Sequence, residues 1–230
     1  MIARFEELDF RATSMGDLTL RRRVEPELGI DVYEVKLGEH YLMSSLFVVA
    51  EEELAHLGLA AVVGDKIDVL VGGLGLGYTA VAALADARVE RLAVIETMDA
   101  VISWHESKLL PASAALVDDA RTSLVLDDFF ALMRRAPTET WDAILVDIDH
   151  STQHQLDPSH ADLYTPAGLS SLARHLKPGG VFGLWSDDPP EPSFVTYLGE
   201  VFATAEAHVV SFDNFLTGGV STNTVYVARL

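Results

Sequence analysis

The segment IDVLVGGLGLGYTA, residues 67–80, decides the fold class that this sequence predicts. Residues 67–72 have the apolar pattern of a buried strand, and a cluster of glycines separates them from a helical pattern that starts at Tyr78. A strand, a glycine-rich turn and a helix begin a βαβ unit, in which a ligand can approach backbone amides at the helix N-terminus. The segment is equally compatible with a turn that serves only strand–helix packing.

The alternation of apolar strands and helices continues towards the C-terminus, which predicts βαβ units and a parallel sheet. Two further strand-like runs then follow each other without a helix, so we expect an antiparallel hairpin at the end of the sheet. The predicted fold class is α/β with a mostly parallel, seven-stranded sheet. The expected strands are 67–72, 90–96, 121–126, 141–147, 179–186, 206–212 and 222–229, and the expected helices are 78–86, 98–107, 128–135, 166–175 and 192–203.

The residues before this alternation form a different pattern. Residues 17–45 alternate between apolar and polar positions, with proline and glycine at the turns, which predicts a small antiparallel β element. Residues 46–63 have the pattern of a helix that ends at Gly64. We therefore divide the chain into a β element with a connecting helix at 1–64 and an α/β domain at 65–230.

Composition excludes several classes of function. The 230 residues include 35 acidic and 16 basic side chains, a formal charge of −19, so the surface repels nucleic acid phosphates and anionic lipids. The absence of cysteine excludes disulfides, thiolate catalysis and Cys-ligated metal sites. No apolar run is long enough for a membrane span and no signal-peptide pattern is present, so we expect a cytoplasmic protein without nucleic acid or membrane partners.

In an open parallel sheet the ligand crevice lies beyond the carboxyl ends of the strands, so residues that follow strands are candidates for binding. Glu96 follows the second strand, 21 residues beyond Gly75, where an acidic side chain can accept both hydroxyl hydrogens of a ribose. The alternative for Glu96 is an exposed charge at a helix start. Asp127 and Asp128 follow the third strand; one fits an N-cap, and the other can accept a hydrogen bond from an adenine amino group.

Two carboxylates follow the fourth strand. Asp147 and Asp149 are separated by one residue, with more acids at Asp157 and Asp162. An uncompensated acidic cluster is repulsive, so in a crevice it normally serves a cation, either a metal or a protonated amine. The alternative is a solvated acidic loop in a very acidic protein.

The metal interpretation is the weaker of the two. His150, His154 and His160 lie near these aspartates, but their spacing matches no tight ligand motif, and we expect no metal. The other histidines, His105 among them, are scattered and fit surface or packing positions. A serine nucleophile is not indicated either, because the sequence has no G-x-S-x-G elbow.

Taken together, several segments resemble the spermidine synthase-like proteins, relatives of the polyamine aminopropyltransferases. The resemblance runs from about residue 39 to the C-terminus and implies the Rossmann-like S-adenosylmethionine methyltransferase fold. The segments that carry it are VLVGGLGLGYT (69–79), VIE (94–96), LDDFF (126–130), WDAILVDID (141–149), LYTPAGL (163–169) and LKPGGVFGLWS (176–186).

The resemblance implies a site that takes S-adenosylmethionine or its decarboxylated form as co-substrate. Gly73, Gly75 and Gly77 would pass under the methionine-derived part of that molecule, and Glu96 would hold the ribose. Asp128 and Phe129 would contact the adenine.

The resemblance also implies which residues hold the acceptor amine. Asp147 matches the active-site aspartate of the family, and Asp149 is the nearest candidate for the second acid that holds a cationic amine. Dimeric relatives also make a homodimer through the N-terminal β element possible for this chain.

The sequence departs from the family at two places. Leu76 stands where a true spermidine synthase has an aspartate in the glycine loop. The family's Tyr-His-Glu segment before the first core strand is absent, and Tyr41-Leu42-Met43-Ser44-Ser45 stands in its place.

We expect aminopropyl transfer to a polyamine-type amine, with Asp147 orienting the amine and relaying its proton and Asp149 acting mainly through its charge. Methyl transfer from intact S-adenosylmethionine is the first alternative, because Leu76 removes an acid that would repel the methionine carboxylate. A dinucleotide-dependent oxidoreductase also fits G-x-G-x-x-A, but the closing hairpin supplies no second mononucleotide-binding half. A binding module that has lost its activity is the last alternative.

Overall fold

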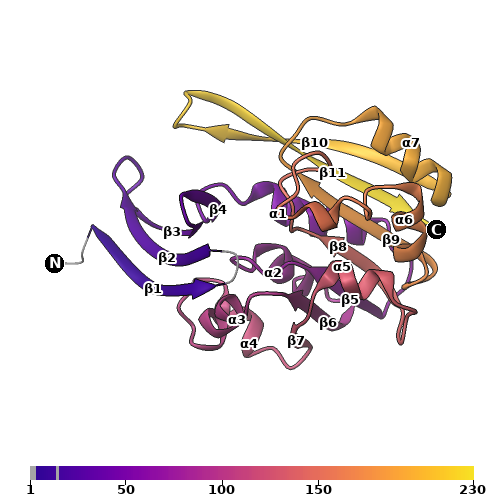
Figure 1. Ribbon diagram of the computed structural model, residues 1–230, viewed down its shortest axis with the longest axis horizontal. Coiled ribbons are helices and arrows are strands. Elements are labelled where there is room, and N and C mark those ends of the chain that lie inside the picture. The colour runs from indigo at the N-terminus through magenta and orange to yellow at the C-terminus, as the bar shows by residue number, and fades with distance from the viewer. Residues whose placement is uncertain (1–3, 14–15) are drawn as a thin grey trace.

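The computed structural model describes residues 4–13 and 16–230 and contains a large and a small sheet (Figure 1). The strands of the small sheet are β1 (Phe5–Thr13), β2 (Gly16–Glu25), β3 (Ile30–Leu37) and β4 (His40–Ser44). Those of the large sheet are β5 (Ile67–Gly72), β6 (Val89–Glu96), β7 (Thr122–Leu126), β8 (Trp141–Val146), β9 (Leu176–Ser186), β10 (Thr204–Asn214) and β11 (Gly219–Arg229). The helices are α1 (Val49–Ala60), α2 (Tyr78–Leu84), α3 (Asp99–Glu106), α4 (Ser113–Val117), α5 (Phe129–Arg134), α6 (Pro166–Ala173) and α7 (Pro192–Val201), with a short 3₁₀ turn at Pro158–His160.

The large sheet has the strand order β10-β11-β9-β8-β5-β6-β7. The five strands from β9 to β7 are parallel, whereas β11 is antiparallel to both β9 and β10. The predicted α/β class, the seven strands and the closing hairpin are therefore confirmed. Because β5 pairs with β6 on one side and β8 on the other, the strand order reverses at β5, and a ligand crevice is expected beyond its carboxyl end.

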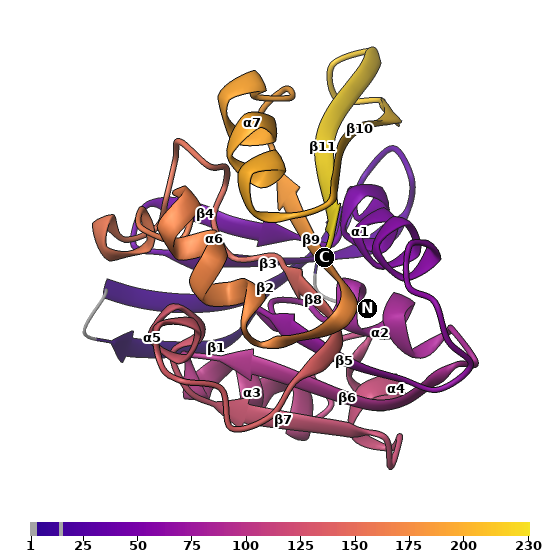
Figure 2. The ribbon, with the colours of Figure 1, turned by 90° about the vertical axis from the view of Figure 1, so that its right-hand side faces the viewer.

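Helices cover both faces of the large sheet (Figure 2). Side chains alternate along β5, so that Val69 and Val71 join one hydrophobic core and Leu70 joins the other. The first core contains residues of α1 to α4, and the second contains residues of α5 to α7. Since both faces of the central strands are buried, these strands are apolar without interruption, which is why they were recognisable in the sequence.

The small sheet packs onto the first of these cores through Leu18, Leu20 and Val35. Three of its strands confirm the β element predicted at 17–45. The outer strand β1 was not predicted, because it is an edge strand whose charged residues obscure the alternation. Asp9 on β1 nevertheless contacts the large unit, where its Oδ2 accepts a hydrogen bond of 2.6 Å from Trp104 Nε1.

The division of the chain at residue 64 stays a prediction. In the structure α1 packs against α2 and against β9 and β11 of the large sheet, so it lies within the α/β unit in space. Within the part of the chain that the structure describes, no helix is long and apolar enough to cross a membrane.

Candidate active site at the carboxyl ends of the strands

The glycine-rich turn after β5 needs its glycines for conformation and for close approach. Gly73, Gly75 and Gly77 have φ angles of 93°, 48° and 94°, which side chains rarely tolerate. A Cβ atom on Gly73 would collide with the backbone oxygen of Asp147, and one on Gly75 would lie 3.3 Å from Met43 Sδ of β4. The turn is therefore pressed between the end of β8 and the small sheet.

Glu96 lies beneath this turn. Its side chain is buried, Oε2 accepts a hydrogen bond of 3.1 Å from the amide of Leu74, and Oε1 accepts one of 2.9 Å from that of Met98. Burial raises the pKa of Glu96, and the backbone donors oppose that rise. The alternative of an exposed charge at a helix start is therefore wrong, while the ribose contact stays a prediction.

His105 supports the same turn from α3. It is fully buried, its Nε2 donates to the carbonyl oxygen of Gly75 at 3.0 Å, and its Nδ1 lies 3.3 Å from the hydroxyl of Ser113. Burial lowers the pKa of His105, which keeps the ring neutral. Of the two positions the sequence left open for this histidine, packing is the observed one, and its hydrogen bond to the turn went unpredicted.

The acids after β7 have separate local roles. Asp128 is the N-cap of α5, since its Oδ1 accepts a hydrogen bond of 3.0 Å from the amide of Ala131, and the predicted cap is confirmed. Asp127 accepts from the amide of Asp128 at 2.8 Å. Phe129 is buried with its ring against Gly72, directly behind the turn. The adenine contacts of these side chains stay predictions.

Asp147 and Glu51 form a pair of acids at the crevice. Thr79 at the start of α2 links them, because its hydroxyl donates to Asp147 Oδ2 at 2.8 Å and lies 3.1 Å from the carbonyl oxygen of Glu51. Burial raises the pKa of Asp147 to about 6. Burial, together with the charge of Asp147, raises the pKa of Glu51 to about 8. Glu51 was not among the site residues predicted from the sequence; its only signal was the acidic run Glu51-Glu52-Glu53 at the start of a helix.

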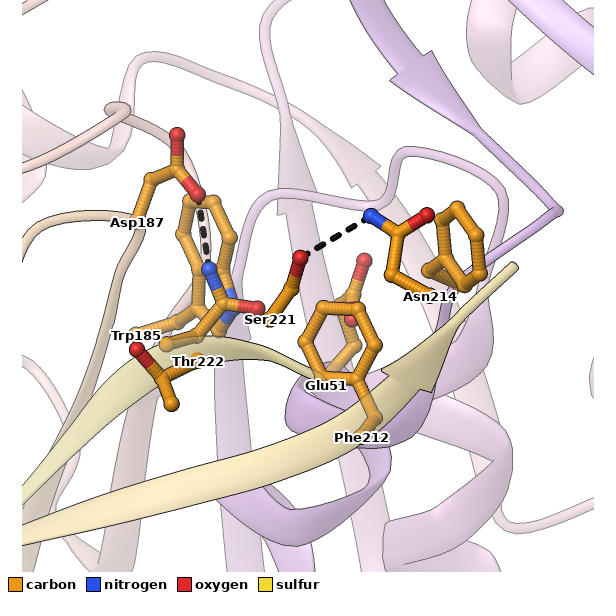
Figure 3. A pocket seen from close by; sticks show the side chains of 9 residues that line it. Glu51, Trp185, Asp187, Phe212, Asn214, Ser221 and Thr222 are labelled. Carbon is orange, nitrogen blue, oxygen red and sulfur yellow. Dashed lines mark hydrogen bonds between the residues drawn. The ribbon is translucent and has the colours of Figure 1, made fainter. Parts of the chain in front are cut away.

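A cavity of about 360 Å³ opens beside Glu51, between α1, the end of β9 and the closing hairpin (Figure 3). Asp187 accepts a hydrogen bond of 2.7 Å there from the amide of Asn223. The rings of Phe47 and Phe212 lie 5.5 Å apart. The residues that line the cavity are Phe47, Glu51, Trp185, Asp187, Phe212, Asn214, Ser221, Thr222 and Asn223. Carboxylates beside aromatic rings suit a cationic ligand with an apolar part.

Asp149 is placed differently from its sequence neighbour Asp147. It is 2% exposed, and neither aspartate is among the residues that line the cavity. Its Oδ1 accepts from Leu156 N at 2.7 Å and from His160 Nδ1 at 2.8 Å, and its Oδ2 accepts from Tyr164 Oη at 2.7 Å. The carboxylate therefore holds the segment 150–164 in place.

The histidines considered for a metal make other contacts. His154 Nδ1 lies 3.0 Å from Asp188 Oδ2, and the ring of His160 stacks on Phe130 with 3.7 Å between centroids. Over residues 4–13 and 16–230, no group of three or more His, Asp or Glu side chains is arranged to hold a metal ion.

We predict that Asp149→Asn will lower the free energy of unfolding by about 1–3 kcal/mol, since an amide nitrogen cannot accept from the buried Tyr164 hydroxyl or from its other donors. Urea denaturation measures this loss, and Asp213→Asn on β10 is the matched control. A mutant with unchanged stability but reduced turnover would instead return Asp149 to the electrostatic role expected from the sequence.

The fold and the site together define the class of this protein. A parallel sheet with its strand order reversed at β5, a glycine turn and an antiparallel closing hairpin make up the Rossmann-like S-adenosylmethionine methyltransferase fold. The chain belongs to the spermine/spermidine synthase domain family, whose model matches residues 47–196. The resemblance found in the sequence is thereby confirmed.

Relatives of this chain include a putrescine N-methyltransferase and a spermine synthase. It is 32% identical to putrescine N-methyltransferase 2 of Nicotiana tabacum over 130 residues, which are 56% of this chain and 35% of that protein. It is 32% identical to spermine synthase of Arabidopsis thaliana over 131 residues, or 57% of this chain and 34% of the relative. The matches thus span about a third of the length of these relatives.

Solved structures agree on the fold. The crystal structure of spermidine synthase from Thermotoga maritima matches with a TM-score of 0.72 and 19% identity, covering 97% of this chain and 72% of that one. A spermidine synthase in complex with the transition-state analogue AdoDATO matches with a TM-score of 0.73 and 20% identity over the same shares of the two chains.

Proposed function

We propose that this protein transfers an alkyl group from an S-adenosylsulfonium donor to the nitrogen of an amine. The observation that carries the proposal is a cavity lined by Glu51 and Asp187. Asp147 is linked to Glu51 through Thr79, and its backbone oxygen lies against Gly73 of the glycine turn. Aminopropyl transfer from decarboxylated S-adenosylmethionine to a polyamine-type amine is the first candidate, because of the family to which the chain belongs.

The donor binds over the glycine turn in this proposal. The methionine-derived part lies along Gly73, Gly75 and Gly77, where side chains are absent. Glu96 faces the ribose hydroxyls from beneath the turn. The adenine is flanked by the residues that follow strand β7, which are Asp127, Asp128 and Phe129.

The acceptor amine occupies the acidic cavity. Its ammonium group is attracted by Asp187 and Glu51, and its carbon chain contacts the rings of Phe47 and Phe212. Asp147 orients the reacting nitrogen, and Asp149 is a positioning residue that holds the segment after β8.

The reaction is a displacement at the carbon next to sulfur. The nitrogen lone pair forms the new N–C bond while the C–S bond breaks, and its electrons go to the sulfonium, which becomes a neutral thioether. The nitrogen gives up a proton in the process. Because the sulfonium is already a good leaving group, the protein contributes chiefly by aligning the two reactants and excluding water.

Methyl transfer is the second candidate, and Leu76 favours it. This side chain is 5% exposed and packs in the first core, so the turn presents no acid at that position to repel the carboxylate of intact S-adenosylmethionine. An amine methyltransferase would use the same cavity and the same displacement.

We also propose that the protein acts in the cytoplasm and forms a homodimer. The support for the dimer is the row of exposed apolar side chains on the small sheet, with Phe5 57%, Phe10 53% and Tyr41 54% exposed. The support for the location is the absence of cysteine from the sequence.

Calorimetric binding of the two donors, followed by addition of putrescine and mass analysis, tests the proposed function. Tighter binding of the decarboxylated donor with release of methylthioadenosine would establish aminopropyl transfer. Tighter binding of intact S-adenosylmethionine with a methylated amine would establish the second candidate. Binding of neither donor would contradict the proposal, and binding without turnover on any amine would indicate a module that has lost its activity.

A further inference from the structure

We propose that Glu51 accepts the proton that the acceptor amine must lose before it can attack. This inference rests on the proposed function and assigns the proton to a different residue from the one expected from the sequence. Glu51 lies in the first turn of α1, outside the strand ends where the sequence analysis looked for catalytic residues.

Glu51 lines the cavity and is linked to Asp147 through Thr79. Its carbonyl oxygen lies 3.1 Å from the Thr79 hydroxyl, which donates to Asp147 at 2.8 Å, so the two acids share one neighbour. Its side chain lines the cavity (Figure 3). An amine in the cavity can therefore contact Glu51, whereas Asp147 is not among the residues that line the cavity.

The charged and titratable groups around Glu51 all carry negative or no charge. They are Asp147 after β8, Asp187 after β9, Glu52 on α1 and Tyr78 on α2. No lysine or arginine is among the groups that shift its pKa within the described part of the chain. Burial and the charge of Asp147 raise the pKa of Glu51 to about 8, whereas that of Asp147 is raised by burial to about 6. Glu51 is therefore a group that can gain and lose a proton near neutral pH.

Position and acidity both make Glu51 the acid that can receive the proton of an ammonium group, since Glu51 lines the cavity and Asp147 is not among the lining residues. An alkylammonium ion has a pKa of roughly 10, so transfer to an ordinary carboxylate with a pKa of about 4 is opposed by roughly six pH units. A carboxylate that titrates near pH 8 reduces the mismatch to roughly two units and is better matched to general-base catalysis. The charge of Asp147 contributes by raising the pKa of Glu51.

The step balances in protons and electrons. The ammonium proton moves to the ionised Glu51, and the freed lone pair forms the N–C bond as the C–S electrons pass to sulfur. Glu51 then returns its proton to water through the open cavity. Below its pKa Glu51 is already protonated and cannot accept, so turnover should rise with pH through this value.

The test compares Glu51→Gln with Glu53→Gln, which makes the same change on the same helix at a partly exposed acid that contacts His56. The two substrates are an alkyl amine that is charged at the assay pH and its fluorinated analogue that is neutral there. We expect E51Q to lower kcat for the charged amine about 100-fold and to abolish the rise in activity around pH 8. The neutral amine should be transferred at close to the wild-type rate, and E53Q should resemble the wild type with both amines.

Two results would overturn this inference alone. One is an E51Q enzyme with wild-type kcat and an unchanged pH profile for the charged amine. The other is an equal loss of kcat for both amines, which would mean that Glu51 only maintains the shape of the cavity. Failure of the proposed function looks different, because the wild-type chain itself would then form no product from either amine.

Discussion

Replacing Gly73 by alanine should lower the free energy of unfolding by about 2–5 kcal/mol and abolish binding of the nucleoside donor. Two effects add up at this position. The φ angle of 93° is unfavourable for any side chain, and the added Cβ would collide with the backbone oxygen of Asp147, which cannot turn aside as a side chain can. Strain of this kind costs about 1–2 kcal/mol, and overpacking costs a further 1–3 kcal/mol or so. Urea denaturation and donor calorimetry measure the two consequences.

Gly218→Ala is the matched control for this experiment. Gly218, in the hairpin turn between β10 and β11, has a φ of 70°, but a Cβ there would meet nothing within 4 Å. The Gly218→Ala variant therefore has the backbone strain without the collision. Its free energy of unfolding should fall by only about 1 kcal/mol. Equal losses in G73A and G218A would show that the turn after β5 can move away from β8 and that the close approach is not required.

Asp147→Asn should lower kcat about 1,000-fold while donor binding and folding are preserved. The amide can still accept from Thr79, so the local structure is kept, but the negative charge that orients the amine is lost. Stability should not fall. Because burial raises the pKa of Asp147 to about 6, above its ordinary 3.8, ionisation destabilises the folded chain increasingly as the pH rises through this window, and the neutral amide removes that penalty.

The measurements for this variant are steady-state turnover, donor calorimetry and urea denaturation at pH values on both sides of 6. Asp118→Asn serves as the control, since Asp118 forms an exposed ion pair with Lys108. Surface ion pairs of this kind contribute little to the free energy of unfolding, so the kcat and stability of D118N should resemble those of the wild type. Full turnover in D147N would refute the role proposed for Asp147.

Local sequence patterns predicted most of the strands and helices of the fold. The strand predicted at 67–72 coincides with β5, and the strands predicted at 90–96 and 141–147 differ from β6 and β8 by one residue. These strands are buried on both faces, so their apolar runs are continuous. The edge strand β1 was missed because its charged side chains face solvent, and the short helix α4 was missed because it has too few residues to show a period.

The candidate site was only partly predictable. Asp147 was found because a parallel sheet places the residues after each strand at one edge. Asp149 was given a similar role by its closeness in sequence, yet its carboxylate accepts from Leu156, His160 and Tyr164. Glu51 was missed because nothing in its own helix indicates which strand ends that helix will face.

The sequence by itself determined the α/β class, the order of the strands and helices, the glycine turn and the family of this protein. These features depend on periodicity and on residue types a few positions apart, which express local backbone preferences. Only the tertiary structure decided that Glu51 joins Asp147 through Thr79 and that the hairpin closes a cavity beside Glu51. Those contacts join segments far apart in the chain, and the packing of helices on the sheet brings them together. Burial and neighbouring charge, which shift the pKa values of the two acids, exist only once that packing is complete.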